Sequence, residues 1–479
     1  MTTAEPLTAE DAALLYAEAP GTQLQIGALC FFEGAPLRDR RGRLRSAALR
    51  SHVAARLDGL PRFRQRIAPA VADVAAPMWV DDADFDIARH CKVARLSPPG
   101  GPEALRQFLD RLLGRPLDTA HPLWDIHVVE GVDGSGRGGG RRAGGADTVA
   151  VIVRAHHVMA DGIALHAAAT LLLDPEPRPP HPTRHGWSPR PAPGALGLTA
   201  RALGVRGRRQ ADLALAVGRE VLDPRRAPAN ARRAARAVAA VRGGLPAPAP
   251  SLPITAPVGP HRAFAWDSVP MEGITAVKVA CGATVNDVVL AITTGALRRH
   301  LEATSSFDPA ARRPRALIPI GDPASAADMR NRFSIRSVDL PVDEDDPLER
   351  VRAIHSLMHA PDAPARGSVM PHLFSVADVV PPRVLRAVVP PLLAHQPLVN
   401  LAVSDIPGSR LPLYLWESRM LGLHPFINVV GNVALIVGVL SYVDDLGIGV
   451  TVDRDVVGDP RPLADHLRAA YEELAGLVP

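Results

Sequence analysis

One short segment limits the possible folds of this chain more than any other feature. Residues 154–162 read Arg-Ala-His-His-Val-Met-Ala-Asp-Gly and directly follow the apolar, mostly β-branched run of residues 148–153. Such a run, ending in polar residues and glycine, is typical of a strand that leads into a tight loop. A helix is predicted to restart at residues 163–169, which are mainly alanine, leucine and isoleucine. This strand–loop–helix unit can hold an imidazole at the mouth of a cleft.

The HHxxxDG pattern predicts general-base chemistry at its second histidine. Because neutral imidazole can take a proton from a hydroxyl group and return it to a leaving group, His157 is the candidate base. Asp161 is expected to fix the loop, and Gly162 permits either a positive φ or a close backbone approach. His156 either donates a hydrogen bond or shapes the loop. A lone HxxxD pattern arises often by chance, but the second histidine, the glycine and the preceding strand favour catalysis.

Two further motifs lie on either side of this segment. Residues 122–124 read Pro-Leu-Trp, and residues 286–287 read Asn-Asp within Gly-Ala-Thr-Val-Asn-Asp-Val-Val-Leu-Ala. With HHxxxDG, these motifs and their order resemble the bacterial wax ester synthase/acyl-CoA:diacylglycerol acyltransferase family, and the likeness covers most of the 479 residues. The resemblance implies catalytic roles at HHxxxDG and supporting or substrate-binding roles at the other two motifs. The residues concerned are His156, His157, Asp161 and Gly162, and then Trp124, Asn286 and Asp287.

The resemblance also implies a fold and a reaction. The expected fold is α/β (α+β), with two chloramphenicol-acetyltransferase-like domains whose mixed sheets are flanked by helices and meet at an active-site cleft or tunnel. The expected reaction moves a long-chain acyl group from acyl-CoA to diacylglycerol or a long-chain fatty alcohol, with His157 as base and without a covalent intermediate. No cofactor or metal is expected, since acyl-CoA is a substrate.

Departures from the family's patterns leave other functions open. Where the family usually reads Ser-Asn-Val-Pro-Gly-Pro, residues 404–409 have Asp405 in place of the amide and Ser409 in place of the last proline. Residues 319–323 and 330–332 also differ from the expected patterns. One alternative is a non-catalytic lipid-binding or lipid-droplet-associated paralogue. Another is a carrier-dependent condensation or polyketide-associated acyltransferase, although no carrier-protein module accompanies the motif.

Structural roles are equally natural for the supporting motifs. Trp124 is more often a core aromatic than a substrate contact. Asn286 and Asp287 begin a helix-like run, and either side chain could cap that helix by accepting backbone N–H bonds. A second role, facing the catalytic loop, is about as well supported for this pair.

Low-complexity segments predict the domain boundaries. Residues 134–145 are glycine-rich without a phosphate-loop pattern, which indicates a hairpin insertion. A proline-rich stretch at residues 175–193 argues against regular structure there. We therefore expect an N-terminal acyltransferase domain at residues 1–180, a Pro/Arg-rich linker with helical segments at 181–250, and a C-terminal acyltransferase-like domain at 251–479.

Composition excludes several classes of protein and suggests a location. The three cysteines are widely spaced and lack a CxxC or histidine pattern, so neither a disulfide framework nor a zinc site is indicated. No segment offers the roughly 18–20 uninterrupted apolar residues of a membrane span, and the apolar runs at 388–403 and 429–440 are interpreted as buried strands or core. We expect a cytoplasmic protein that contacts the inner membrane face or lipid droplets peripherally.

The arginine-rich segment admits three interpretations. No acidic residue occurs between Asp223 and Asp267, whereas several arginines do, and Leu213, Val217 and Val221 recur at helical spacing just before it. A linker helix packed on the protein is slightly favoured over an interfacial helix on anionic lipid. Nucleic acid is a poor third and is not an expected partner, because the segment lacks interleaved aromatic residues.

Overall fold

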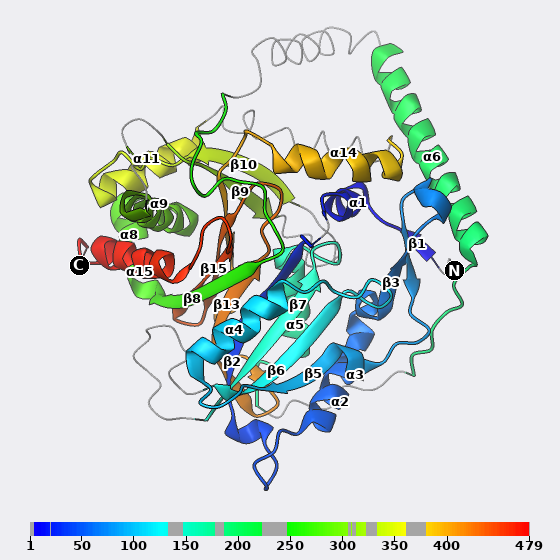
Figure 1. Ribbon diagram of the computed structural model, residues 1–479, viewed down its shortest axis with the longest axis horizontal. Helices are drawn as coiled ribbons and strands as arrows, with labels where there is room; N and C mark the ends of the chain where they lie inside the picture. The colour runs from blue at the N-terminus through cyan, green and yellow to red at the C-terminus, as the bar shows by residue number, and fades with distance from the viewer. Residues whose placement is uncertain are drawn as a thin grey trace.

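The structure is a computed structural model in which two six-stranded sheets stand side by side within layers of helices (Figure 1). The glycine-rich segment and most of the arginine-rich segment lie outside the described residues. The described residues are 4–19, 21–132, 147–177, 186–222, 247–304, 308, 313–321, 333–360 and 380–478.

The first sheet carries the strand that leads into the HHxxxDG loop. The predicted strands before and after the glycine-rich segment are confirmed, and they pair with each other in antiparallel register, Trp124 opposite Ala155. Only the last pair in the sheet, β5 with β6, is parallel among the described strands. In spatial order the strands are β12 (Tyr414–Leu415), β13 (Ser418–Ile427), β2 (Gln25–Glu33), β7 (Thr148–His156), β6 (Trp124–Val132) and β5 (Cys91–Arg95).

The second sheet is mixed and covered by a group of helices. Its central strands β9, β11 and β14 run parallel, and the flanking pairs are antiparallel. The order is β10 (Phe333–Asp339), β9 (Arg315–Gly321), β11 (Leu401–Ile406), β14 (Leu435–Tyr442), β15 (Asp445–Asp453) and β8 (Arg262–Pro270). The helices that gather beside it in Figure 1 are α8 (Met271–Cys281), α9 (Val285–Thr304), α11 (Pro347–His359) and α15 (Arg461–Ala475).

Strand β13 ties the two halves of the chain together. Although it lies in sequence between β11 and β14 of the second sheet, it pairs with β2 of the first, with Phe426 opposite Gly27. A Cβ atom on Gly27 would lie 1.9 Å from the Val153 carbonyl oxygen and 2.5 Å from the Phe426 ring, and a Cβ on Gly449 would lie 1.8 Å from the Pro425 carbonyl oxygen. These glycines therefore allow β13, a strand of the first sheet, to pack closely against β15 of the second sheet as well.

The remaining elements surround these sheets. A small sheet of β1 (Ala4–Pro6), β4 (Met78–Asp81) and β3 (Gln65–Ala68) packs near the long helix α6 (Ala195–Leu222). The other α-helices are α1 (Ala9–Tyr16), α2 (Ser46–Arg56), α3 (Ile87–His90), α4 (Gly101–Leu113), α5 (Gly162–Leu172) and α14 (Pro382–Ala394). Short 3₁₀ helices occupy Ala35–Leu37, Leu57–Gly59, Pro61–Arg64 and Val71–Asp73.

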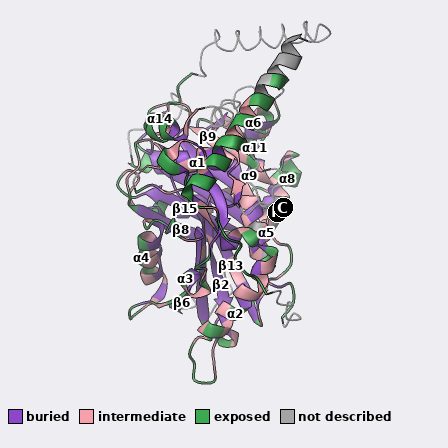
Figure 2. Cartoon of the chain, turned by 90° about the vertical axis from the view of Figure 1, so that its right-hand side faces the viewer, coloured by how far each residue is buried: buried purple, intermediate pink, exposed green. Residues whose placement is uncertain are grey.

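Burial follows this layering. Figure 2 shows buried residues along the strands and exposed residues on α4, α6 and α14. No single helix among the described residues is long and apolar enough to cross a membrane. Helices α8 and α9 reach that length and composition only as a pair bent by 104°.

The interpretation of residues 388–403 as strand or core is wrong in its first half. Residues 388–394 belong to α14, which contains Pro390 and Pro391 near its end. Prolines remove backbone donors and disfavour a helix interior, so they misled the prediction. The helical spacing of Val384, Val388 and Leu392 was the better signal.

Candidate active site

Backbone hydrogen bonds fix the HHxxxDG loop at the end of β7. The His157 N–H donates to the Leu24 carbonyl at 2.8 Å, and the Met159 N–H donates to the His156 carbonyl at 2.9 Å. The predicted helix follows as α5, which begins at Gly162. The loop is therefore hydrogen-bonded both to its own strand and to Leu24, the residue just before β2.

His156 points into the protein and shapes the loop. Its ring is buried, with 1% of the residue exposed. Its Nδ1 accepts the Val158 N–H at 3.0 Å, and its Nε2 pairs with the Glu18 carboxylate, which also accepts the Leu24 N–H at 2.9 Å. Because Nδ1 accepts, Nε2 is the nitrogen that carries the proton toward Glu18. Two roles were considered for His156, donating a hydrogen bond and shaping the loop. These contacts favour the shaping of the loop.

His157 faces the opposite side, where it lines a large cavity. Successive side chains at a strand end point to opposite faces, so one histidine of the pair enters the core when the other enters the cavity. The cavity measures about 640 Å³ and is bounded by side chains of both sheets, including Val151 of the first and Ile436 of the second. A volume of this size is within the range of small-molecule sites.

Asp161 holds the first turn of the helix at the edge of this cavity. Its carboxylate accepts the Ala164 N–H at 2.8 Å, which makes it the N-cap of α5. The residue is 4% exposed and belongs to the cavity wall. Its capping role fixes where the loop ends and thereby where His157 lies.

Gly162 allows close packing and does not adopt a left-handed backbone conformation. Its φ lies outside the left-handed region, and a Cβ at this position would lie 2.5 Å from Ile406 Cδ1 of β11. At Gly321 of β9, a Cβ would lie 2.4 Å from Ile163 Cδ1. The start of α5 thus packs against the second sheet, and the HHxxxDG loop lies where the two halves of the chain meet.

Most of the cavity wall is apolar, and the polar side chains in it are few. Aliphatic residues make up the greater part of its lining, and they come from both sheets, from α5 and α14 and from the loops between them. Such a wall suits a long hydrocarbon chain, because apolar surface of a chain is removed from water on entry. The polar or charged residues among those that line it include His157, Asp161, Arg315, Ser337, His395, Gln396, Ser404, Asp405 and Asn428.

Asp405 introduces a carboxyl group into this apolar space. It lies on β11 in the cavity wall, and burial raises its pKa to about 6. Sequence comparison singled it out only as a departure from the family's asparagine, and its contact with the cavity could not be inferred from the sequence. A neutral carboxylic acid can donate a hydrogen bond that a carboxylate cannot.

Trp124 is a core residue in this structure. It is 2% exposed, and its indole N–H donates to the Phe63 carbonyl at 2.8 Å. Its ring stacks on His90 with centroids 4.5 Å apart. Trp124 does not belong to the cavity wall formed by the described residues.

Asn286 and Asp287 begin α9, and neither is part of the described cavity wall. The Asp287 carboxylate accepts the Thr284 N–H at 2.9 Å, and the Thr284 hydroxyl accepts the Asp287 N–H at 3.2 Å. This reciprocal pair is a capping box. The Asp287 carboxylate also accepts the His355 Nδ1–H at 2.8 Å. Of the two roles considered for Asp287, these contacts support capping.

Comparisons with known proteins agree on one family. Residues 7–289 match the wax ester synthase/diacylglycerol acyltransferase catalytic domain, and residues 329–475 match the WS/DGAT C-terminal domain. A Mycobacterium tuberculosis H37Rv protein named "Probable diacyglycerol O-acyltransferase" is 31% identical over 485 residues, covering 98% of this chain and 96% of that protein.

Solved structures show the same fold. A wax ester synthase/diacylglycerol acyltransferase from Marinobacter aquaeolei VT8 has a TM-score of 0.63 at 22% identity, covering 98% of this chain and 100% of that chain. The first condensation domain of the calcium-dependent antibiotic synthetase has a TM-score of 0.58 at 14% identity, covering 99% and 96%. The expected two-domain α/β architecture is confirmed by these matches.

Proposed function

This chain belongs to the wax ester synthase/diacylglycerol acyltransferase family, and we propose that it transfers a long-chain acyl group from acyl-CoA to diacylglycerol or a fatty alcohol, with His157 as the general base. One observation carries the proposal: the His157 imidazole lines a large cavity whose walls are mostly aliphatic. A base and a space for hydrocarbon are the two things that this reaction needs in one place.

The proposed reaction proceeds in a single active site without an acyl-enzyme. His157 removes the proton from the acceptor hydroxyl as that oxygen attacks the thioester carbonyl carbon. The C–S bond then breaks, and the imidazolium gives its proton to the departing thiolate, which leaves an ester and free CoA. General-base catalysis of this kind contributes roughly 10²–10⁴-fold, and positioning of the two substrates supplies much of the remainder.

The supporting residues act on His157 through the loop. His156 and Glu18 hold the strand end, and Asp161 holds the start of α5. Gly162 lets that start approach Ile406 of the second sheet. We assign positioning roles to these residues, because their hydrogen bonds and packing keep the loop between the two sheets. A misplacement of about 1 Å can cost 10²-fold in rate.

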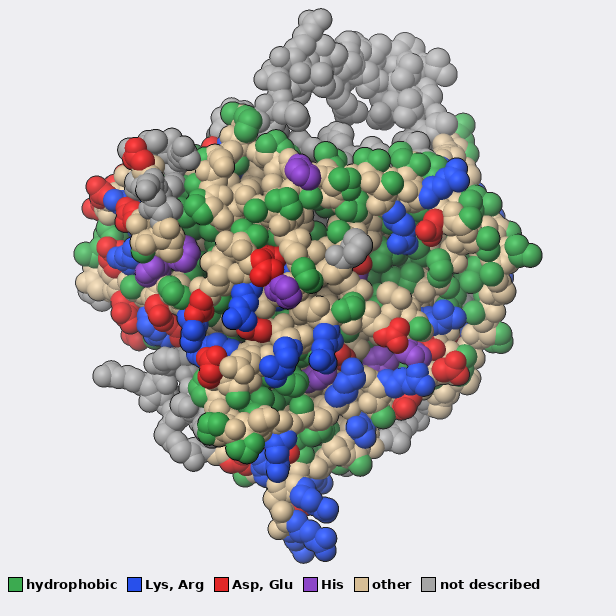
Figure 3. All heavy atoms as spheres, in the orientation of Figure 1, with side chains coloured by type: hydrophobic (Ala, Val, Ile, Leu, Met, Phe, Trp, Pro, Cys, Tyr) green, Lys and Arg blue, Asp and Glu red, His purple; other side chains and the backbone are tan. Residues whose placement is uncertain are grey.

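We further propose that α14 contacts a lipid surface from which the acceptor enters. Val384, Val388 and Leu392 lie four residues apart on this helix and are 42%, 53% and 53% exposed. Leu392 also belongs to the cavity wall, so the exposed stripe is continuous with the cavity. Figure 3 shows hydrophobic side chains along the upper edge of the molecule, where α14 and α6 lie in Figure 1. Leu213, Val217 and Val221 of α6 have side chains outside the described residues.

The lipid contact can be tested by sedimentation with vesicles that contain phosphatidylcholine and about one-third phosphatidylglycerol. Val388→Asp places a charge in the stripe and should reduce binding severalfold. Val279→Asp is the control, because Val279 is 74% exposed on α8, away from α14. Equal binding by wild type and both variants would contradict the proposed contact.

The proposed reaction is tested by thiol release from palmitoyl-CoA with purified wild type. Dioleoylglycerol and hexadecanol are supplied in separate reactions, and chromatography identifies the lipid product. Acceptor-dependent thiol release with the matching ester is the expected result, and it names the preferred alcohol. Binding of palmitoyl-CoA without release in either reaction would instead favour the non-catalytic lipid-binding function.

A further inference from the structure

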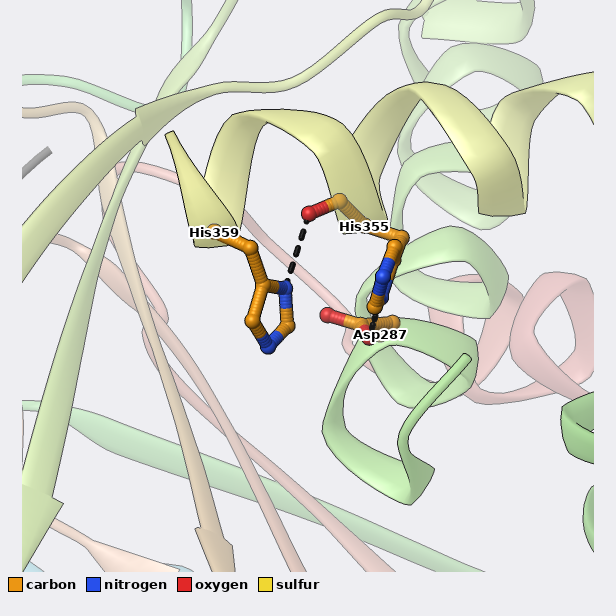
Figure 4. Close-up of side chains that lie close together, drawn as sticks. All are labelled: Asp287, His355 and His359. Carbon is orange, nitrogen blue, oxygen red and sulfur yellow. Dashed lines mark hydrogen bonds and ion pairs between the residues drawn. The ribbon is translucent and has the colours of Figure 1, made fainter. Parts of the chain in front are cut away.

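Three side chains on the far side of the second sheet form a cluster that the proposed reaction does not use. Asp287 lies in the first turn of α9, and His355 and His359 lie one turn apart at the end of α11 (Figure 4). For each residue one ligand atom can be chosen so that all three lie within 4.8 Å of one another. The two imidazole rings have centroids 4.2 Å apart.

One carboxylate oxygen of Asp287 lacks a partner in this cluster. Asp287 is 0% exposed, and its Oδ1 has no hydrogen-bond partner among the residues that the structure describes. The other oxygen, Oδ2, accepts from the Thr284 N–H and the His355 ring. In Figure 4 the free oxygen extends to the side on which His359 lies. A buried carboxylate oxygen without a partner is costly, and a bound cation would remove that cost.

The histidines are oriented as metal-binding histidines usually are. His359 donates its Nδ1–H to the His355 carbonyl at 2.9 Å, which leaves the lone pair of its Nε2 available. The His355 ring is hydrogen-bonded to Oδ2 of Asp287 at 2.8 Å, and this contact fixes the orientation of the ring. The ion-pair partner of Asp287 is a histidine, which can be neutral, and not a permanently charged arginine or lysine.

We propose that Asp287, His355 and His359 bind a divalent transition-metal ion, with zinc favoured. Two imidazoles and one carboxylate are ligands that zinc prefers, with bonds of about 2.0–2.2 Å. Ligand atoms of a tetrahedral ion with such bonds lie about 3.3–3.6 Å apart, and the three atoms here lie within 4.8 Å of one another, so side-chain rotations that bring them closer would close the cluster. His359 is exposed, which leaves a side open for water as the fourth ligand.

The ion would act as a clamp between two helices. It would join the end of α11 to the start of α9, whose first turn is held by Asp287. His355 and His359 lie four residues apart, but Asp287 lies 68 residues before the first of them, so the sequence alone did not bring the three together. The cysteine pattern that argued against zinc has no bearing on this site. None of the three residues is part of the described cavity wall, so the clamp stabilises the fold and is independent of the proposed reaction.

The test uses untagged full-length protein stripped with EDTA and then titrated with Co²⁺ and Zn²⁺. We expect one Co²⁺ per chain with a visible d–d absorption band, displacement of that band by Zn²⁺, and a rise in Tm of several degrees with Zn²⁺. His359→Ala should abolish the band and the rise in Tm. Asp287→Asn, which keeps an oxygen for the helix cap but removes the charge of one ligand, should lose most of the Co²⁺ absorption at the concentration that saturates wild type.

His395→Ala is the matched control. His395 is also exposed and also has its Nδ1 bonded to the carbonyl four residues earlier, but the described residues give it no place in the cluster. The control should bind Co²⁺ like wild type. Wild type that shows no saturable Co²⁺ band, or a band and a rise in Tm that survive unchanged in His359→Ala, would overturn the proposal.

Discussion

Helices α5 and α9 both use an aspartate to hold their first turn, and they serve different purposes. Each has an aspartate in or just before its first turn that accepts a backbone N–H, from Ala164 to Asp161 and from Thr284 to Asp287. The start of α5 lies between the two sheets, in the wall of the cavity. The start of α9 lies in the outer layer of helices with α8, α11 and α15 (Figure 1). A local signature therefore says how a helix begins, whereas position in the fold decides whether its residues lie at the cavity.

The surroundings of the two aspartates explain the difference. Next to Asp161, Gly162 packs against Ile406 of the other half of the chain, so the capped turn is part of an interface with a cavity beside it. Asp287 contacts His355 of a neighbouring helix in the same half. If position decides function, activity should depend on the first turn of α5 and not on that of α9.

The largest effect is expected for His157→Ala. Loss of the base should lower kcat by at least about 10²-fold, whereas Tm should change by no more than about 3 °C, because a side chain at a cavity contributes little core packing. Steady-state thiol release and thermal melting measure the two quantities. If His157→Ala keeps more than a tenth of wild-type kcat, His157 is not the general base.

Asp161→Ala should lower both stability and activity. The lost N-cap bond costs about 1–2 kcal/mol of unfolding free energy, and the freed loop should reduce kcat by about 10–100-fold. The matched control is Asp346→Ala, which removes the N-cap of α11, where the carboxylate accepts from Leu348 and Glu349. If both variants keep full activity, the positioning role of Asp161 is wrong.

Asp405→Asn should change how stability depends on pH. Burial raises the folded-state pKa of Asp405 from 3.8 to about 6, so the native state binds more protons than the unfolded state between these values. Its contribution to stability is therefore present below about pH 4 and is lost as the pH rises through 6. The loss is at most about 3 kcal/mol.

Urea unfolding at pH 4 and pH 8 measures this effect. Asparagine does not titrate, so the stability of Asp405→Asn relative to wild type should be greater at pH 8 than at pH 4. Using the difference between the proteins removes the contribution of Asp110, whose pKa burial also raises to about 6. An equal difference at both pH values would show that folding does not raise the pKa of Asp405.

Asp287→Ala should have the smallest effect, and on stability only. Removing the bonds to Thr284 and His355 costs stability, but it also removes the unpartnered oxygen, so we expect a net loss of about 1–2 kcal/mol. Urea unfolding in EDTA, which excludes any contribution of metal, gives the value. A loss above about 4 kcal/mol would indicate a larger structural role at the start of α9.

The sequence predicted the local unit well because its signals are local. The β-branched run before His156 and the alanine-rich run after Gly162 specify a strand and a helix, and the structure has β7 and α5 there. The choice between a positive φ and close packing at Gly162 needed the second sheet, because Ile406 is 244 residues away in the chain. Long-range contacts of this kind leave no periodic pattern.

The same limit applies to the cavity and to β13. Nothing in residues 418–427 indicates that they pair with β2 of the first sheet, since strand pairing depends on the register of distant segments. Likewise, Asp405 looked only like a departure from a motif until β11 placed it in the cavity wall. Motif order identified the family, but only the fold separates the residues at the cavity from those, like Asp287, that cap a helix elsewhere.

The most direct test compares the two helix starts in one experiment. Single-turnover transfer of the palmitoyl group, with enzyme in excess over palmitoyl-CoA and a saturating acceptor, isolates the chemical step for wild type, His157→Ala and Asp287→Ala. We predict that His157→Ala is slowed by at least about 10²-fold and that Asp287→Ala stays within about threefold of wild type. Equal slowing of both variants, or an unslowed His157→Ala, would contradict the assignment of the chemistry to the start of α5.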